Sequence, residues 1–370
     1  MKLSLTQENL SRALGMVGRV VSSRSSLPVL SNVLLSTDSK RLRIAATNLE
    51  VGINCWIGCK VDDDGAITVP ARLFSEFVSS LPGGNLELST DDLILQVKTP
   101  HYQSNINGIS AEEFPLIPEI KSKPVLTLDI NGFRDALAQV VIAASLDEAR
   151  PVLSGVHLFT NDKQLVMVAT DSYRLAEKKL KLADKPAEKV SMIVPARTMQ
   201  ELGRILAEAT GELQVFLSDN QVMFQADNIE LTSRLIEGQF PNYQQIIPED
   251  TETGIEIDTA EFSRITKVAN LFARENAGGV KLEIKAGGKV QVVSAASQVG
   301  ENTSSADCIT LGGDGEISLN ARYLSEALGV VKAPQVQFSI SGKLNPCVIR
   351  PLEKEQVADD YLHIIMPLRT

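Results

Sequence analysis

An arginine ends the same short phrase at three places in the chain. The phrase reads VPAR at residues 69–72 and 194–197 and LNAR at 319–322, so Arg72, Arg197 and Arg322 are separated by 125 residues each time. Basic side chains gathered on one surface hold a phosphate backbone by charge, in a salt-sensitive and sequence-independent way. The first chemistry that these residues indicate is therefore contact with a nucleic-acid backbone.

A glutamate four residues after each arginine supports a second interpretation. Glu76, Glu201 and Glu326 stand at these positions, where an ion pair on a solvated helix face contributes about 0.2–0.5 kcal/mol. An arginine in the first turn of a helix faces the positive end of the helix dipole, at a cost of about 0.3–1 kcal/mol. The ion pair offsets this cost without explaining why the arginine recurs, so both interpretations stay open on these residues.

Each phrase is predicted to open a helix. Proline suits the first helical position, where its missing N–H would have no partner in any case, and this predicts that Pro70 and Pro195 are the first residues of two helices. Apolar residues follow at helical spacing and leave the arginine off the apolar stripe. They are Phe74, Phe77, Val78 and Leu81, then Met199, Leu202 and Leu206, and finally Leu324, Leu328 and Val331.

The rest of the chain repeats with the same period. Residues 27–51 match residues 150–174, and residues 278–297 form a weaker third copy. Each copy predicts two strands joined by a polar turn, preceded by one helix and followed by the second helix and further strands. We therefore expect an α+β protein of three similar domains, each with two helices and antiparallel sheets, over residues 1–123, 124–249 and 250–370.

The composition narrows the class of protein. The chain has 370 residues, a formal net charge of −10 and 44% hydrophobic residues. Apolar runs fall short of the roughly 18 residues that a membrane helix needs, and no secretory signal is visible at the N-terminus. Cys55 and Cys59 in CWIGC allow a redox or metal pair, but two thiols in a strand-like run are more often buried. We expect the reducing cytoplasm, no metal site and no cofactor.

Other basic residues extend the arginine pattern. Arg12 and Arg19 fall opposite the apolar stripe of the helix predicted within residues 8–21, and Arg24 lies in the serine-rich loop SSRSS (22–26). Serines around one arginine suit a phosphate contact. If these helix faces line one concave surface, an acidic protein has a positive interior that permits sliding along DNA.

Signals for catalysis are poor. The sequence lacks GxGxxG, GxxxxGK[ST], GxSxG and HExxH. Its three histidines, His101, His157 and His363, fall in different repeats, which disfavours a three-histidine metal site. Two rivals to a DNA-holding protein remain, a nuclease that acts on DNA in the same groove and a peptide-binding scaffold that no longer binds DNA.

The chain resembles the beta subunit of bacterial DNA polymerase III, the sliding-clamp family, from end to end. The resemblance is carried by LPVLSNVLL, TVPAR, RPVLSGV, VATDSYRLA, VPAR, FPNYQQIIP and the terminal MPLR. It implies three domains of one fold, closed by two protomers into a head-to-tail ring with helices lining the hole. It also implies a processivity factor without enzymatic activity. Expected partners are duplex DNA, the polymerase III alpha subunit, the clamp loader and other proteins with a clamp-binding motif, and no membrane.

The resemblance also carries residue roles. DNA contacts carry over to Arg24, Arg72 and Arg197, and the internal repeat extends them to Arg322. A partner-peptide groove between the second and third domains, with an arginine at its edge, matches Leu153, Thr170, Ser172, Tyr173, Arg174, Leu175, Pro241, Ile246, Ile365, Met366, Pro367 and Leu368. The apolar part of the dimer interface is expected from Ile106, Leu271 and Phe272.

Overall fold

The structure is a computed structural model that describes residues 1–21, 27–248, 250–273, 278–296 and 300–369. The α-helices in these ranges are α1 (Gln7–Val17), α2 (Ala71–Ser80), α3 (Ile130–Val141), α4 (Ala196–Leu206), α5 (Thr259–Ala273) and α6 (Ala321–Gly329). The short 3-10 turns are η1 (Gly18–Val20), η2 (Pro28–Ser31), η3 (Ala111–Glu113), η4 (Pro151–Ser154) and η5 (Gln244–Ile246). None of the described helices has the length and apolar character needed to cross a bilayer.

The strands follow the predicted repeat. The first repeat holds β1 (Lys2–Thr6), β2 (Asn32–Asp38), β3 (Arg41–Thr47), β4 (Val51–Gly58), β5 (Lys60–Asp63), β6 (Ala66–Pro70), β7 (Asn85–Asp91), β8 (Ile94–Lys98) and β9 (Gln103–Asn107). The second holds β10 (Leu126–Asp129), β11 (Gly155–Asn161), β12 (Gln164–Thr170), β13 (Arg174–Lys181), β14 (Ser191–Pro195), β15 (Glu212–Leu217), β16 (Gln221–Ala226) and β17 (Ile229–Arg234). The third holds β18 (Thr253–Asp258), β19 (Gly279–Lys285), β20 (Lys289–Ala296), β21 (Gly300–Asp307), β22 (Ile309–Gly312), β23 (Gly315–Asn320), β24 (Gln335–Ile340), β25 (Cys347–Glu353), β26 (Gln356–Val357) and β27 (Tyr361–Ile365).

Each repeat has a strand, a helix, a set of antiparallel strands, a second helix and further strands. This order confirms the predicted α+β fold of three similar clamp domains. The two helices of the first repeat pack together, α1 against α2, and so do those of the third repeat, α5 against α6.

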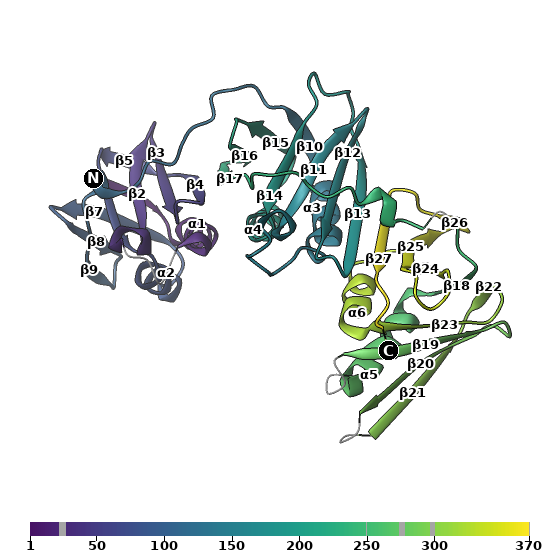
Figure 1. Cartoon of the computed structure of the whole chain (residues 1–370). Coiled ribbons are helices and arrows are strands. Elements are labelled where there is room, and N and C mark those ends of the chain that lie inside the picture. Colours follow the sequence, from purple (N-terminus) through teal and green to yellow (C-terminus); the bar gives the residue numbers. More distant parts are fainter. Residues whose placement is uncertain (22–26, 249, 274–277, 297–299, 370) are drawn as a thin grey trace. The chain divides into compact units, whose positions relative to one another are not determined.

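Two of the sheets continue from one repeat into the next. β4 of the first repeat pairs with β17 of the second, and β13 of the second pairs with β27 of the third. In Figure 1 the teal β13 and the yellow β27 lie side by side although they are far apart in the sequence. The two sheets have the orders β10-β15-β16-β17-β4-β3-β2-β6 and β14-β11-β12-β13-β27-β25-β24-β18-β22, with β26 beside β25. The other sheets are β5-β1-β7-β8-β9 and β21-β20-β19-β23.

The chain forms two compact units, and each of these two long sheets lies within one of them. The first unit comprises residues 1–131 and 201–235, and the second comprises residues 132–200 and 236–370. The second repeat therefore gives strands to both units, because β17 completes the sheet of the first repeat and β13 completes that of the third.

The helices that carry the repeated arginines begin one residue later than predicted. Pro70 is the last residue of β6 and the N-cap of α2, with a ψ of 113°, and Pro195 likewise ends β14 before α4 begins at Ala196. The prediction that the prolines are the first helical residues is wrong, since the backbone at Pro70 is still extended and paired with Asn32. A proline at the end of an edge strand sacrifices no ladder hydrogen bond.

The third helix of this kind begins with a true side-chain cap. Asn320 accepts the backbone N–H groups of Arg322 at 3.0 Å and Tyr323 at 3.4 Å through its Oδ1 atom. Asparagine at this position stabilises a helix by about 1 kcal/mol relative to alanine. The change from VPAR to LNAR therefore replaces a proline, whose φ is restricted, with an asparagine that caps the helix. The arginine stays in the first turn.

The predicted apolar stripes face the cores. Phe74 and Val78 of α2 are fully buried, while Phe77 is half-buried. Burial of one such side chain stabilises the fold by about 1.5–3 kcal/mol. The other stripe residues are also buried, namely Leu81, Met199, Leu202, Leu206, Leu324, Leu328 and Val331.

Candidate functional site

The three repeated arginines are all exposed, and their partners differ from one repeat to the next. Arg72 donates from Nε to Glu76 at 2.8 Å, and this bond raises the pKa of Arg72. Arg322 lies 3.8 Å from Glu326. The predicted i,i+4 pair is thus confirmed in the first and third repeats.

The second repeat departs from that pattern. Glu201 is bonded to Arg204 of the same helix, and Arg197 forms no ion pair with any described residue. An ion pair therefore explains at most two of the three arginines. Arg197 keeps its charge exposed without a partner, which favours the interpretation that something outside the helix requires it.

The other predicted DNA contacts lie on or after the first helix. Arg12 is exposed on α1, and Arg19 is exposed on η1, because α1 ends at Val17 rather than continuing as predicted. Gln7 Nε2 donates to the Val78 carbonyl at 2.7 Å and ties α1 to α2. The structure thus brings Arg12, Arg19 and Arg72 onto a packed helix pair and its extension, whereas Arg24 lies outside the described residues.

The turn between β12 and β13 is fixed by an aspartate. Asp171 Oδ1 accepts the backbone N–H groups of Tyr173 and Arg174, both at 2.9 Å, and Thr170 donates its hydroxyl to the Arg174 carbonyl at 2.7 Å. Ser172, between them, has a φ of 77°. Asp171 therefore has a structural role, because its carboxylate closes the turn that follows β12.

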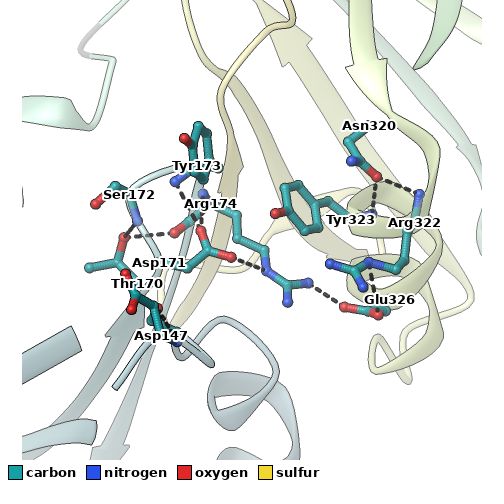
Figure 2. A network of polar contacts seen from close by, with 11 residues as sticks. Asp147, Thr170, Asp171, Ser172, Tyr173, Arg174, Asn320, Arg322, Tyr323 and Glu326 are labelled. Atoms are coloured by element: carbon teal, nitrogen blue, oxygen red, sulfur yellow. Dashed lines mark hydrogen bonds and ion pairs between the residues drawn. The ribbon is translucent and has the colours of Figure 1, made fainter. Parts of the chain in front are cut away.

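Arg174 is the centre of a network that joins the second and third repeats (Figure 2). Its Nε donates to Asp171 Oδ2 at 3.1 Å, its NH1 donates to Glu326 Oε2, and its guanidinium carbon lies 4.3 Å from the ring centre of Tyr323. Only 7% of Arg174 is exposed. The prediction of an arginine at the edge of the peptide groove is wrong in this respect, because two carboxylates and an aromatic face hold the side chain inside.

Glu326 forms ion pairs with both arginines of the network. One carboxylate oxygen receives Arg174 and the other lies 3.8 Å from Arg322, whose guanidinium is also 5.3 Å from the Tyr323 ring centre. Sequence reasoning treated Glu326 only as a local partner of Arg322 and missed Tyr323 altogether. The available signal was their place beside Arg322 on the helix predicted from LNAR.

The twelve predicted peptide-binding residues differ widely in exposure. Thr170, Arg174, Leu175 and Ile365 are buried and form the support of the site. The residues open to a ligand, exposed or half-buried, are Leu153, Ser172, Tyr173, Pro241, Ile246, Met366, Pro367 and Leu368. Beneath them lies an apolar cluster that includes Val168, Leu175, Phe240, Tyr243 and Ile364.

The C-terminal segment is held against this site by two backbone bonds. Met366 N–H donates to the Tyr173 carbonyl at 2.8 Å, and Leu368 N–H donates to the Ser318 carbonyl at 2.8 Å. Leu368 also lines a cavity of about 870 Å³ with Leu344 and residues of β19, β20 and β23. Leu344 was not predicted as a site residue, because it is a lone leucine in a polar turn; it is 76% exposed.

The three predicted interface residues are not equivalent. Leu271 on α5 is 61% exposed and Phe272 is half-buried, so both offer apolar surface. Ile106 is only 6% exposed, because β9 turns this side chain into the core of its own sheet. Its place in the apolar interface stays a prediction, and in this single chain Ile106 offers less apolar surface than Leu271 does.

The cysteines and the possible metal ligands form no reactive centre within the described residues. The four cysteines are free thiols, and burial raises the pKa of Cys55 and of Cys347 to about 12. In the described ranges, no group of three or more His, Cys, Asp or Glu side chains is arranged to hold a metal ion.

One buried and one half-buried imidazole, those of His363 and His157, make the folded state sensitive to acid. Burial, assisted by the charge of Arg174, lowers the pKa of His363 to about 3, and burial lowers that of His157 to about 4, from an ordinary 6.5. Below pH 6.5 the unfolded chain therefore binds more protons than the folded chain, so stability falls as the pH falls. The loss approaches about 1.4 kcal/mol per pH unit for the fully buried His363 and is smaller for the half-buried His157, which solvent partly screens. Urea unfolding between pH 7 and pH 5 measures it.

A matched pair of variants assigns this effect. His363→Gln is expected to reduce the slope of stability against pH, whereas His101→Gln, at an exposed histidine, leaves it unchanged. Equal unfolding free energies at pH 7 and pH 5 in the parent chain would contradict the prediction.

Comparison with known proteins accounts for the whole arrangement. The N-terminal, central and C-terminal domains of the DNA polymerase III beta subunit match residues 1–118, 127–242 and 244–369. A beta sliding clamp of Staphylococcus epidermidis is 29% identical over 363 residues, which are 95% of each chain.

Solved structures agree over the full length. The sliding clamp of Bacillus subtilis aligns with a TM-score of 0.94 and 27% identity, over 100% of this chain and 99% of its own. A Pseudomonas aeruginosa clamp bound to griselimycin aligns with a TM-score of 0.92 and 27% identity, over 100% of both chains. The order of the three matched domains, the repeated helix starts and these full-length alignments lead to one conclusion: the chain belongs to the DNA polymerase III beta subunit family of sliding clamps.

Proposed function

We propose that two copies of the chain join head to tail in a ring that encircles duplex DNA, with clamp domains bounded near residues 123 and 249. As a member of its family the chain is a non-catalytic processivity factor that tethers the polymerase. In the proposed ring the helices line the hole and hold the phosphate backbone without reading bases. The contacts are Arg12, Arg19, Arg24, Arg72, Arg197 and Arg322.

A single observation carries the DNA part of the proposal. An exposed arginine stands in the first turn of the second helix of every repeat, against the helix dipole, and in the second repeat no ion pair with a described residue accounts for it. A polyanion in contact with all three repeats supplies the missing partner.

The peptide part of the proposal rests on the site around Tyr173 and Met366. Eight exposed or half-buried residues, all but Ser172 apolar or aromatic, surround a turn and a C-terminal segment fixed by backbone bonds. Such a surface suits a short segment with hydrophobic anchors. We assign it to the polymerase III alpha subunit, the clamp loader and other proteins with a clamp-binding motif, in the cytoplasm.

The mass in solution tests ring closure. Light scattering is expected to give a mass near twice 40.1 kDa. Leu271→Asp places a charge on the exposed apolar surface of α5 and is expected to shift the protein toward the monomer. Leu73→Asp, at a leucine of α2 that is 55% exposed, is the matched control and keeps the dimer. A monomeric parent chain at micromolar concentration would overturn the ring.

A further inference from the structure

The turn that supports the peptide site occurs a second time, in the first repeat. Residues 47–51 and 170–174 both start with a threonine whose hydroxyl donates to the carbonyl four residues later, at 3.0 Å and 2.7 Å. In both, the next side chain, Asn48 or Asp171, accepts two backbone N–H groups. The residue after it, Leu49 or Ser172, has a φ of 76° or 77°. The two turns are therefore one construction used twice.

The neighbouring strand is placed in the same way at both turns. Arg234 N–H donates to the Glu50 carbonyl at 2.9 Å, just as Met366 N–H donates to the Tyr173 carbonyl at 2.8 Å. Glu50 thus takes the position of Tyr173, and Arg234 takes that of Met366. A loop after a Phe-Pro pair covers an apolar cluster beside each turn.

The turn of the first repeat opens on a cavity of about 200 Å³, which we call the first groove. Ile117 forms its floor and packs on Gly52, where an added Cβ would lie 2.9 Å from Ile117 Cγ2. Leu49 is 50% exposed and Leu116 is 96% exposed. The full lining is Thr47, Leu49, Glu50, Val51, Gly52, Leu116, Ile117, Pro118, Gln221, Thr232, Ser233 and Arg234.

The charges of the first groove are free, unlike those of the peptide site. Glu50 and Arg234 are exposed and form no ion pair within the described part of the chain. At the peptide site, Arg174 is neutralised by Asp171 and Glu326. The first groove therefore offers one cation, one anion and two open leucines, and a ligand that fits it must carry the complementary groups.

We propose that the first groove is a second peptide-binding site, which takes an extended segment of a partner protein with adjacent aliphatic residues between an acidic and a basic residue. The acidic residue pairs with Arg234, the basic residue pairs with Glu50, and the aliphatic side chains cover Leu49 and Leu116. The inference rests on the internal repeat and the free charges. Its ligand differs from that of the peptide site, which has no free charge at the equivalent positions.

Methyl NMR of the full chain tests this assignment with defined probes. The blocked tetrapeptides acetyl-Asp-Leu-Ile-Lys-amide and acetyl-Lys-Leu-Ile-Asp-amide are titrated separately, so that either chain direction is sampled. We expect one of them to shift the methyl signals of Leu49, Leu116 and Ile117 saturably, with a Kd on the order of 1 mM, as is usual for so short a ligand. Acetyl-Asp-Ser-Ser-Lys-amide and acetyl-Lys-Ser-Ser-Asp-amide, without the aliphatic anchors, are expected not to bind.

Surface variants decide whether the recognition is the proposed one. Arg234→Gln and Glu50→Gln are each expected to weaken binding about two- to fivefold, the range of an exposed ion pair. Leu116→Ser is expected to weaken it further, while Leu146→Ser, at a leucine that is 90% exposed elsewhere, leaves it unchanged.

Three outcomes would overturn the proposal. They are no saturable shift up to about 10 mM, equal affinity in the parent chain and the charge variants, or shifts confined to Leu153, Ile246 and Leu368. The last outcome would leave the peptide site and the clamp function intact, and solution mass and retention on DNA report on these independently.

Discussion

Replacing Arg174 with alanine is expected to lower the free energy of unfolding by about 3 kcal/mol, because the loss of one partner of a buried ion pair leaves a buried carboxylate without its opposite charge. The stranded group is Asp171, which is 9% exposed, whereas the half-exposed Glu326 turns to solvent more easily. Tyr323 loses the guanidinium on its face as well. Urea unfolding at pH 7 measures the change.

The same substitution is expected to reduce binding of the polymerase III alpha subunit at least about tenfold, the effect of about 1.4 kcal/mol. Arg174 anchors the turn through Asp171, and the Tyr173 carbonyl of this turn accepts the N–H of Met366. Removal of the Arg174 side chain is therefore expected to loosen both Tyr173 and Met366 in the peptide site. Arg322→Ala is the matched control, since it removes an exposed arginine from the same glutamate and costs at most about 0.5 kcal/mol. An Arg174→Ala chain as stable as the control would show that the network is not a buried ion pair.

Reversing Arg72, Arg197 and Arg322 together to glutamate is expected to abolish loading onto and retention on circular DNA. Each lost phosphate contact removes one released counterion, so the salt dependence of binding is expected to weaken as well. Gel filtration of the protein with nicked circular DNA, over a series of salt concentrations, measures both effects. Cleavage of that DNA by the parent chain with a divalent cation would instead revive a nuclease.

A second triple variant with the same change in net charge tests whether the positions of the three arginines matter. Lys60, Lys163 and Lys289 are exposed lysines on strands or strand turns rather than on the helices. Their reversal changes the net charge of −10 by the same amount and is expected to leave retention unchanged. An equal loss in both triple variants would mean that the total charge of the protein matters and that the helix positions do not.

The periodicity of the sequence was enough to predict the repeated fold. Apolar spacing located both helices of each repeat, and the matched stretches located β2, β3, β11 and β12, because alternation and turn residues are local signals. The start of α2 was missed by one residue, since proline is compatible with both a strand end and a helix start. Such a choice depends on the ladder partner, which for Pro70 is Asn32.

The candidate site could be predicted only in part. A resemblance in VATDSYRLA and MPLR indicated which segments meet, but not which side chains turn inward. Arg174 finds Glu326 152 positions along the chain, so its burial depends on how β13 and β27 pair and not on its neighbours. Ile106 is a similar case, because the register of β9 on β8 directs it into the sheet.

Because two sheets run from one repeat into the next, the three sequence repeats do not coincide with the two compact units of the structure. β17 pairs with β4, and β13 pairs with β27, so the strands of the second repeat belong to two different compact units. Cooperative unfolding follows contacts rather than sequence periods, so a chain with three copies of one fold is expected to unfold as two units. No copy is complete by itself, since removal of any single copy would expose an open strand edge in its neighbour.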